Sequence, residues 1–134
     1  MKKRFFFIAF VLLLSLLSVS IAQEVQYTNQ ITIAWDPVTQ LTDGSPIPAG
    51  DVITYEIFKA DELIGETAEL QYTVTFDQEG EYKVGVRTKR QVASTGDIVY
   101  SEINYSDQNG ESTPNPFVVR FIKPVQMAKN LRLQ

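Results

Sequence analysis

Apolar and polar residues alternate along several short stretches of the chain, the pattern of β-strands that bury one face. Clusters of Gly, Pro, Asp and Ser separate these stretches and predict turns. No stretch after residue 22 has helical periodicity. The sequence therefore predicts an all-β domain whose strands recur roughly every 10–15 residues, as in antiparallel sandwiches. The alternating stretches are 31–35, 55–57, 70–76, 82–86 and 98–105.

The order and spacing of these stretches resemble the fibronectin type III family over residues 27–107. The segments that carry the resemblance are ITIAWDP at 31–37, YEI at 55–57, LQYTVTF at 70–76, GEYKVGV at 80–86 and Ser101. The resemblance implies an immunoglobulin-like antiparallel β-sandwich of about seven strands. It places Trp35, Tyr55, Leu70 and Tyr82 in the structural core, with a tyrosine corner at Tyr82. One departure is at the start, where only residues 23–29 are left for the family's first strand.

The first 22 residues have the order of a secretory signal peptide. Lys2, Lys3 and Arg4 precede an uncharged apolar run, and the small residues Ser20 and Ala22 end it. The run is shorter than the roughly 20 residues of a spanning helix. We expect a signal helix at 1–22 that is removed on export, leaving a secreted or periplasmic protein without a membrane span. An uncleaved N-terminal anchor is the alternative.

Composition narrows the chemistry that the mature chain can perform. The 134 residues include no Cys and no His, which excludes Ser-His-Asp triads, Cys-His pairs and zinc sites built from these ligands. Without residues 1–22, nine basic and sixteen acidic residues remain, a net charge of −7 that argues against a nucleic-acid partner. Asp36, Asp43 and Asp51 lack the spacing of a calcium loop. We expect no enzymatic activity, no metal ion and no cofactor.

A basic cluster follows the stretch 82–86. Arg87, Lys89, Arg90 and Gln91 lead into the loop that ends near Ile98. The resemblance makes this loop a recognition site, and Arg is enriched among residues that dominate protein interfaces. We therefore predict partner binding at these four residues. The alternative is that the cations only balance an acidic body.

The C-terminal stretch 111–134 is basic and strand-prone, and we separate it from a domain at 23–110. After Glu111 there are four basic residues and no acidic one. Phe117, Arg120 and Phe121 are predicted to contact a partner, either an unknown protein or a second copy of the chain. Three interpretations stay open: an extra strand of the same domain, a first strand supplied by 124–134 to its own or a neighbouring sandwich, or a relic of a lost second domain.

Together these features predict a non-catalytic exported module for binding, adhesion or spacing that acts through protein–protein contacts. The alternative is an accessory domain that binds carbohydrate or cell wall. That alternative predicts two or more coplanar, solvent-facing Tyr rings.

Overall fold

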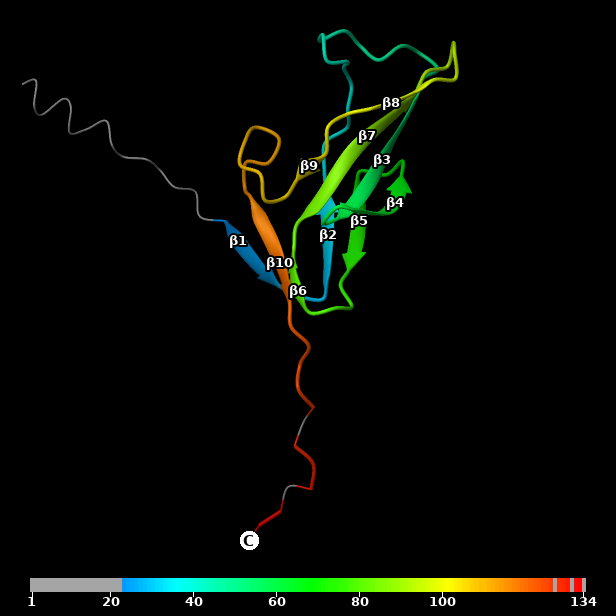
Figure 1. Cartoon of the computed structure of the whole chain (residues 1–134). Helices are drawn as coiled ribbons and strands as arrows, with labels where there is room; N and C mark the ends of the chain where they lie inside the picture. The colour runs from blue at the N-terminus through cyan, green and yellow to red at the C-terminus, as the bar shows by residue number, and fades with distance from the viewer. Residues whose placement is uncertain (1–22, 127, 131, 134) are drawn as a thin grey trace, which may run out of the picture.

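The computed structural model describes residues 23–126, 128–130, 132 and 133 (Figure 1). The predicted signal helix at 1–22 lies outside the described residues. In the described part the fold is all-β, as the alternation predicted, with ten strands and no helix. The strands are β1 Glu24–Tyr27, β2 Gln30–Ala34, β3 Val52–Lys59, β4 Glu62–Thr67, β5 Gln71–Thr75, β6 Gly80–Tyr82, β7 Val84–Gln91, β8 Ile98–Tyr100, β9 Asn104–Tyr105 and β10 Phe117–Phe121.

The strands form three sheets that together are consistent with a β-sandwich. The largest has the order β4-β3-β7-β8, and β9 also pairs with β7. The second contains β2 and β5, and the third has the order β1-β10-β6. All pairs are antiparallel except β1 with β10, which is parallel. Figure 1 shows β3 and β7 as the two longest strands, crossing the molecule side by side.

The core lies where β2 and β5 face the large sheet and β10. Each of these strands contributes the apolar side of its alternating pattern, because successive side chains point to opposite faces. Ile57 and Val119 are fully buried. Partly buried Trp35, Tyr72 and Tyr82 pack around this cluster. The buried cluster is Ile33, Ile57, Val74, Phe76, Val84 and Val119.

Four residues were predicted from the resemblance to lie in the core, and one of them is misplaced. Tyr55 is 3% exposed, and Trp35 and Tyr82 pack against the core while partly buried. Leu70 is 39% exposed, so its predicted core position is wrong. The physical reason is that β5 begins only at Gln71, so the alternation extends one position beyond the strand into a bend.

The loop 107–116, which connects β9 to β10, is held at its base by the hydrogen bonds of one residue, Ser106. Buried Ser106 exchanges two hydrogen bonds with Val84, through its N–H to the carbonyl (2.8 Å) and from the Val84 N–H to its Oγ (3.1 Å). Its carbonyl accepts the Phe117 N–H at 2.7 Å. The chain therefore leaves β9, makes the loop 107–116, and returns as β10 against β6.

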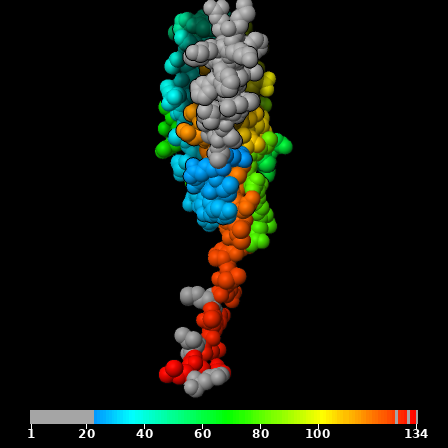
Figure 2. Space-filling view, turned by 90° about the vertical axis from the view of Figure 1, so that its left-hand side faces the viewer, coloured from blue at the N-terminus to red at the C-terminus, as the bar shows by residue number. Residues whose placement is uncertain are grey.

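This arrangement revises the predicted boundary at residue 110. β10 is the central strand of its sheet and contributes buried Val118 and Val119, so the domain extends to Phe121. Among the open interpretations of the tail, the extra strand of the same domain describes Phe117–Phe121. The short β1 pairs with β10 instead of β2. Beyond Phe121 the described residues extend away from the body as a narrow column (Figure 2).

Val119→Ala tests whether β10 belongs to the cooperative core. We expect a loss of about 2 kcal/mol in the free energy of unfolding, since two methyl groups leave a fully buried site. Urea denaturation followed by circular dichroism measures this loss. Val125→Ala is the matched control, because Val125 is 93% exposed in the tail and its truncation should change stability little. Equal effects of the two substitutions would contradict the assignment of β10 to the core.

Candidate functional site

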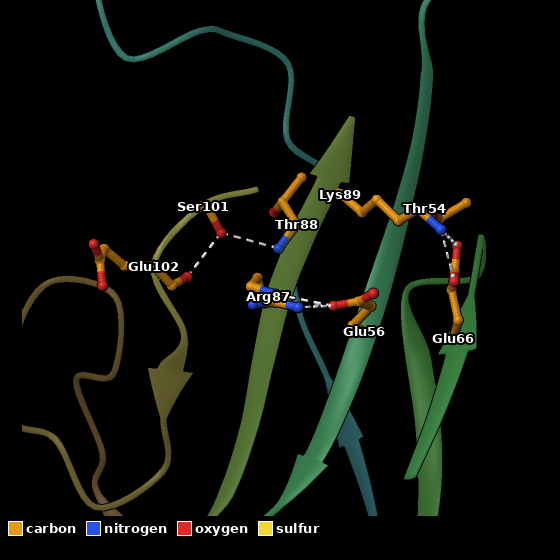
Figure 3. Close-up of polar contacts among 8 residues, drawn as sticks. All are labelled: Thr54, Glu56, Glu66, Arg87, Thr88, Lys89, Ser101 and Glu102. Atoms are coloured by element: carbon orange, nitrogen blue, oxygen red, sulfur yellow. Dashed lines mark hydrogen bonds and ion pairs between the residues drawn. The ribbon is translucent and has the colours of Figure 1, made fainter. Parts of the chain in front are cut away.

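The predicted basic residues Arg87 and Lys89 lie on the outer face of the large sheet, where each meets a carboxylate (Figure 3). The register of β3 and β7 places Arg87 opposite Glu56 and Lys89 opposite Thr54. Arg87 Nε donates to Glu56 Oε2 at 2.9 Å, and the Glu56 side chain is only 6% exposed. The Arg87 guanidinium also lies over the Tyr100 ring (4.2 Å) and the Phe58 ring (5.2 Å). Arg87 thus covers the outer face of the sheet and neutralises a buried charge.

Lys89 and Glu66 form the second pair on this face. Lys89 Nζ lies 3.0 Å from both oxygens of Glu66, which also accepts the Thr54 hydroxyl at 2.6 Å. These bonds lower the pKa of Glu66, with the Thr54 hydroxyl as the largest cause. The same carboxylate raises the pKa of Lys89. Both groups are therefore held in their charged forms, and the Lys89 cation is already paired.

Arg90 belongs to the opposite face of the same strand. Its Nε donates to Asp51 Oδ2 at 2.6 Å, and Asp51 Oδ1 accepts the Ala93 N–H at 2.9 Å. The Ala93 N–H is the largest cause of a lowered pKa at Asp51, with Arg90 contributing further. The Asp51 side chain is 3% exposed, so this carboxylate fixes the start of the loop after β7.

The predicted patch of Arg87, Lys89, Arg90 and Gln91 is therefore not one surface. Alternation along β7 sends Arg90 to the face opposite the other three. The three cations are each paired with a carboxylate of this chain. Gln91 is exposed at the end of the strand. The sequence did not show these pairings because their acids are distant along the chain.

The three predicted contact residues of the C-terminal stretch are engaged within the domain. Phe117 and Phe121 pack against the core cluster. Arg120 pairs with Glu81 on β6, and its guanidinium lies 5.9 Å from the centre of the Tyr27 ring. Glu81 raises the pKa of Arg120. These side chains stabilise the β1-β10-β6 sheet.

A groove of about 1300 Å³ opens between β2 on one side and β7, β8, β9 and the loop 107–116 on the other. Its floor includes core residues, among them Ile33, Val84 and Phe117. The loop wall is fastened to β9, because Asn104 Nδ2 donates to the Ser112 carbonyl (2.9 Å) and Asn104 Oδ1 accepts from Thr113 (2.7 Å). The sequence analysis did not predict this groove, and its indirect signal was the short segment 23–29 left for the first strand that the resemblance implies.

The edge of β2 along this groove is unpaired in the described part of the chain, since its sheet contains only β2 and β5. The Trp35 N–H donates to the Leu70 carbonyl (3.0 Å), and the Phe76 N–H donates to the Asn29 carbonyl (2.8 Å). These two bonds determine which residues of β2 and β5 form hydrogen-bonded pairs. Odd-numbered residues of β2 therefore bond to β5, and the even-numbered ones direct their N–H and C=O groups to the open edge. The Thr28 hydroxyl donates to the Gln30 carbonyl and accepts the Gln30 N–H. The N–H and C=O groups of Thr32 and Ala34 are then the ones left open on this edge of the described chain.

Trp35 lines the groove beside this edge. Its ring packs against Tyr55 at 5.3 Å between centroids, and Tyr55 Oη accepts the Val38 N–H at 3.1 Å. The Trp35 Nε1–H is buried and has no acceptor among the described residues. An unpaired buried donor costs about 1–3 kcal/mol.

The remaining chemistry of the described part is sparse. It holds no cluster of three or more Asp or Glu side chains placed to bind a metal ion. No helix within it is long and apolar enough to cross a membrane. The exposed tyrosines Tyr27 and Tyr100 lie on well-separated strands, β1 and β8, and an Arg lies over each ring (Figure 1). They do not form a common aromatic platform.

Comparison with family models found no match for this chain. Comparisons with curated proteins and with solved structures found none either.

Arg87→Gln tests whether Arg87 serves the fold. We expect a loss of about 2 kcal/mol in the free energy of unfolding, because Glu56 would stay buried without its cation. Lys89→Gln is the matched control on the same strand and face. Its partner Glu66 is 41% exposed, so Lys89→Gln should lower stability clearly less than Arg87→Gln does. Urea denaturation measures both, and unchanged stability of Arg87→Gln would refute the structural role.

Asp51 predicts a pH dependence of stability. Its folded pKa is lowered, so its contribution is fully present above the ordinary Asp pKa of about 3.9 and is lost as the pH falls through the lower folded value. Asp51→Asn should therefore be less stable than the parent near neutral pH, and the difference should shrink in acid. Denaturant titrations at several pH values measure this. Asp107→Asn, on the exposed loop, is the control, and a pH-independent difference for Asp51→Asn would contradict the mechanism.

Proposed function

We propose that this chain is an exported, non-catalytic binding module that accepts an extended protein segment along the open edge of β2. The observation that carries the proposal is the coincidence of two features. Thr32 and Ala34 direct unpaired backbone groups to one side of β2, and the groove lined by core residues opens beside them. An added strand would bond to these groups while its alternate side chains enter the groove.

The dimensions of the groove favour a peptide over a small molecule. Small-molecule pockets are typically about 300–1000 Å³, and the volume of this groove exceeds that range. Main-chain hydrogen bonds give such complexes affinity, and apolar pockets give specificity. Export itself rests on the signal-like sequence of residues 1–22.

We further propose that the sandwich is of the fibronectin type III kind. The pairing of β2 with β5 and the strand order β4-β3-β7-β8 of the large sheet support this assignment. The Tyr82 hydroxyl donates to the Gln78 carbonyl at 2.8 Å, four residues upstream, which is the bond that defines a tyrosine corner. An Asn- and Gln-bearing wall beside Trp35 makes carbohydrate a second candidate ligand for the same groove.

Proline substitutions on the two edges of the β2–β5 sheet test the proposal. Thr32 and Thr73 face each other across the ladder and share one hydroxyl contact at 2.9 Å. Both direct their N–H groups out of the sheet, so Pro removes no ladder bond at either position. Thr32→Pro blocks the groove edge, whereas Thr73→Pro blocks the opposite edge and is the matched control.

The probe is a short labelled peptide of alternating Val and Lys, with binding measured by fluorescence anisotropy. Thr32→Pro should raise the dissociation constant about tenfold or more, and Thr73→Pro should leave it near the parent value. The emission of Trp35, the single tryptophan of the chain, reports occupancy of the groove. Equal binding by the two variants, or a preference for neutral oligosaccharides that Thr32→Pro leaves intact, would refute strand addition.

A further inference from the structure

The walls of the groove are acidic. Three carboxylates line it, those of Asp36, Glu102 and Glu111, and no Lys or Arg does. None of the three has an ion-pair partner among the described residues, although six other acids do. An occupant that carries positive charge would therefore be attracted to this groove, while an acidic segment would be repelled.

The chain itself contains a segment with the complementary character. After Phe121, residues 122–134 include Lys123, Lys129 and Arg132 and no acidic residue. The segment also carries apolar side chains that contact little: Val125 is 93% exposed and Leu133 is 101% exposed. Large apolar groups with this exposure are suited to burial in a partner's groove.

The geometry directs this segment to a neighbour instead of its own groove. Phe121 and Pro124 lie beside Tyr27, Thr28 and Asn29, before the start of β2, whereas the groove is lined by the far end of that strand. Lys123 N–H donates to Glu79 Oε1 at 2.7 Å, which fixes where the chain leaves the domain. The described residues then point away from the body (Figure 2).

We propose that the groove and open β2 edge of one copy bind the C-terminal segment 122–134 of a second copy. This inference rests on the proposed function, for which it names the occupant. Donor and acceptor are different parts of the chain, so the contact is heterologous. Each copy that accepts a segment still offers its own, and the assembly extends into a head-to-tail chain or closes into a ring.

Sedimentation velocity of two single-defect variants tests the inference. Thr32→Pro impairs the acceptor edge and leaves the donor segment intact. K129E/R132E impairs the donor and leaves the acceptor intact. We expect the parent and Thr73→Pro to form oligomers larger than dimers, and each defective variant alone to stay monomeric. An equal mixture of the two defective variants should form a one-to-one dimer that grows no further, because only one functional contact remains.

Charge reversal supplies a second readout that loss of folding cannot imitate. E102K/E111K on the acceptor should weaken association about tenfold, and combining it with K129E/R132E in one chain should restore it. The affinity of the parent should fall as salt rises from about 0.05 M to about 0.5 M. Failure of the combined variant to recover would overturn the assignment of the acidic wall to the basic segment.

The remaining outcomes separate this inference from the proposed function. A monomeric parent that binds the Val-Lys peptide, with sensitivity to Thr32→Pro, would overturn self-assembly and leave strand addition in place. A monomeric parent whose Trp35 emission changes in K129E/R132E would place the segment in its own groove, which also overturns a second copy. A parent that neither associates nor binds the peptide would overturn both.

Discussion

The antiparallel ladder between β3 and β7 is the interaction on which the other parts of this fold depend. Eight residue pairs join Val52–Lys59 to Val84–Gln91. Its inner face carries Ile57 and Val84 into the core, and its outer face is closed by the Arg87–Glu56 pair. Most sheet faces toward solvent stay polar and wet. Here an ion pair whose guanidinium lies over two aromatic rings covers that face, so both sides of the ladder resist water.

The sequence predicted the strands well because alternation depends only on local spacing. It placed β2, β3, β5 and β7 and the turns between them. It misjudged Leu70, where the pattern outlasts the strand, and it joined Arg87, Lys89 and Arg90 into one surface that the pleat divides. Ion pairs such as Arg90 with Asp51 connect residues far apart in the chain, so no local pattern reveals them. The groove could not be predicted from local patterns either, because it depends on the number of strands in each sheet.

The unequal size of the β2-β5 sheet and the five-stranded sheet explains why core residues line the groove. A layer of two strands faces a sheet of five, and β1 pairs with β10 and not with the edge of the smaller layer. A strand that widens the β2-β5 sheet stabilises this sandwich, because burial of apolar area is favourable whether the strand comes from the same chain or from another.

Ser106 closes the loop 107–116 at its base, with bonds to Val84 and Phe117. The two ends of the loop meet at Ser106 regardless of which residues lie between them. The entropic cost of closing a loop also rises only slowly with its length. Changes in the length or sequence of this loop should therefore leave the register of β9 with β7 and of β10 with β6 unchanged. Since the loop is also one wall of the groove, changes in its sequence can reshape that wall at little cost to the stability of the scaffold.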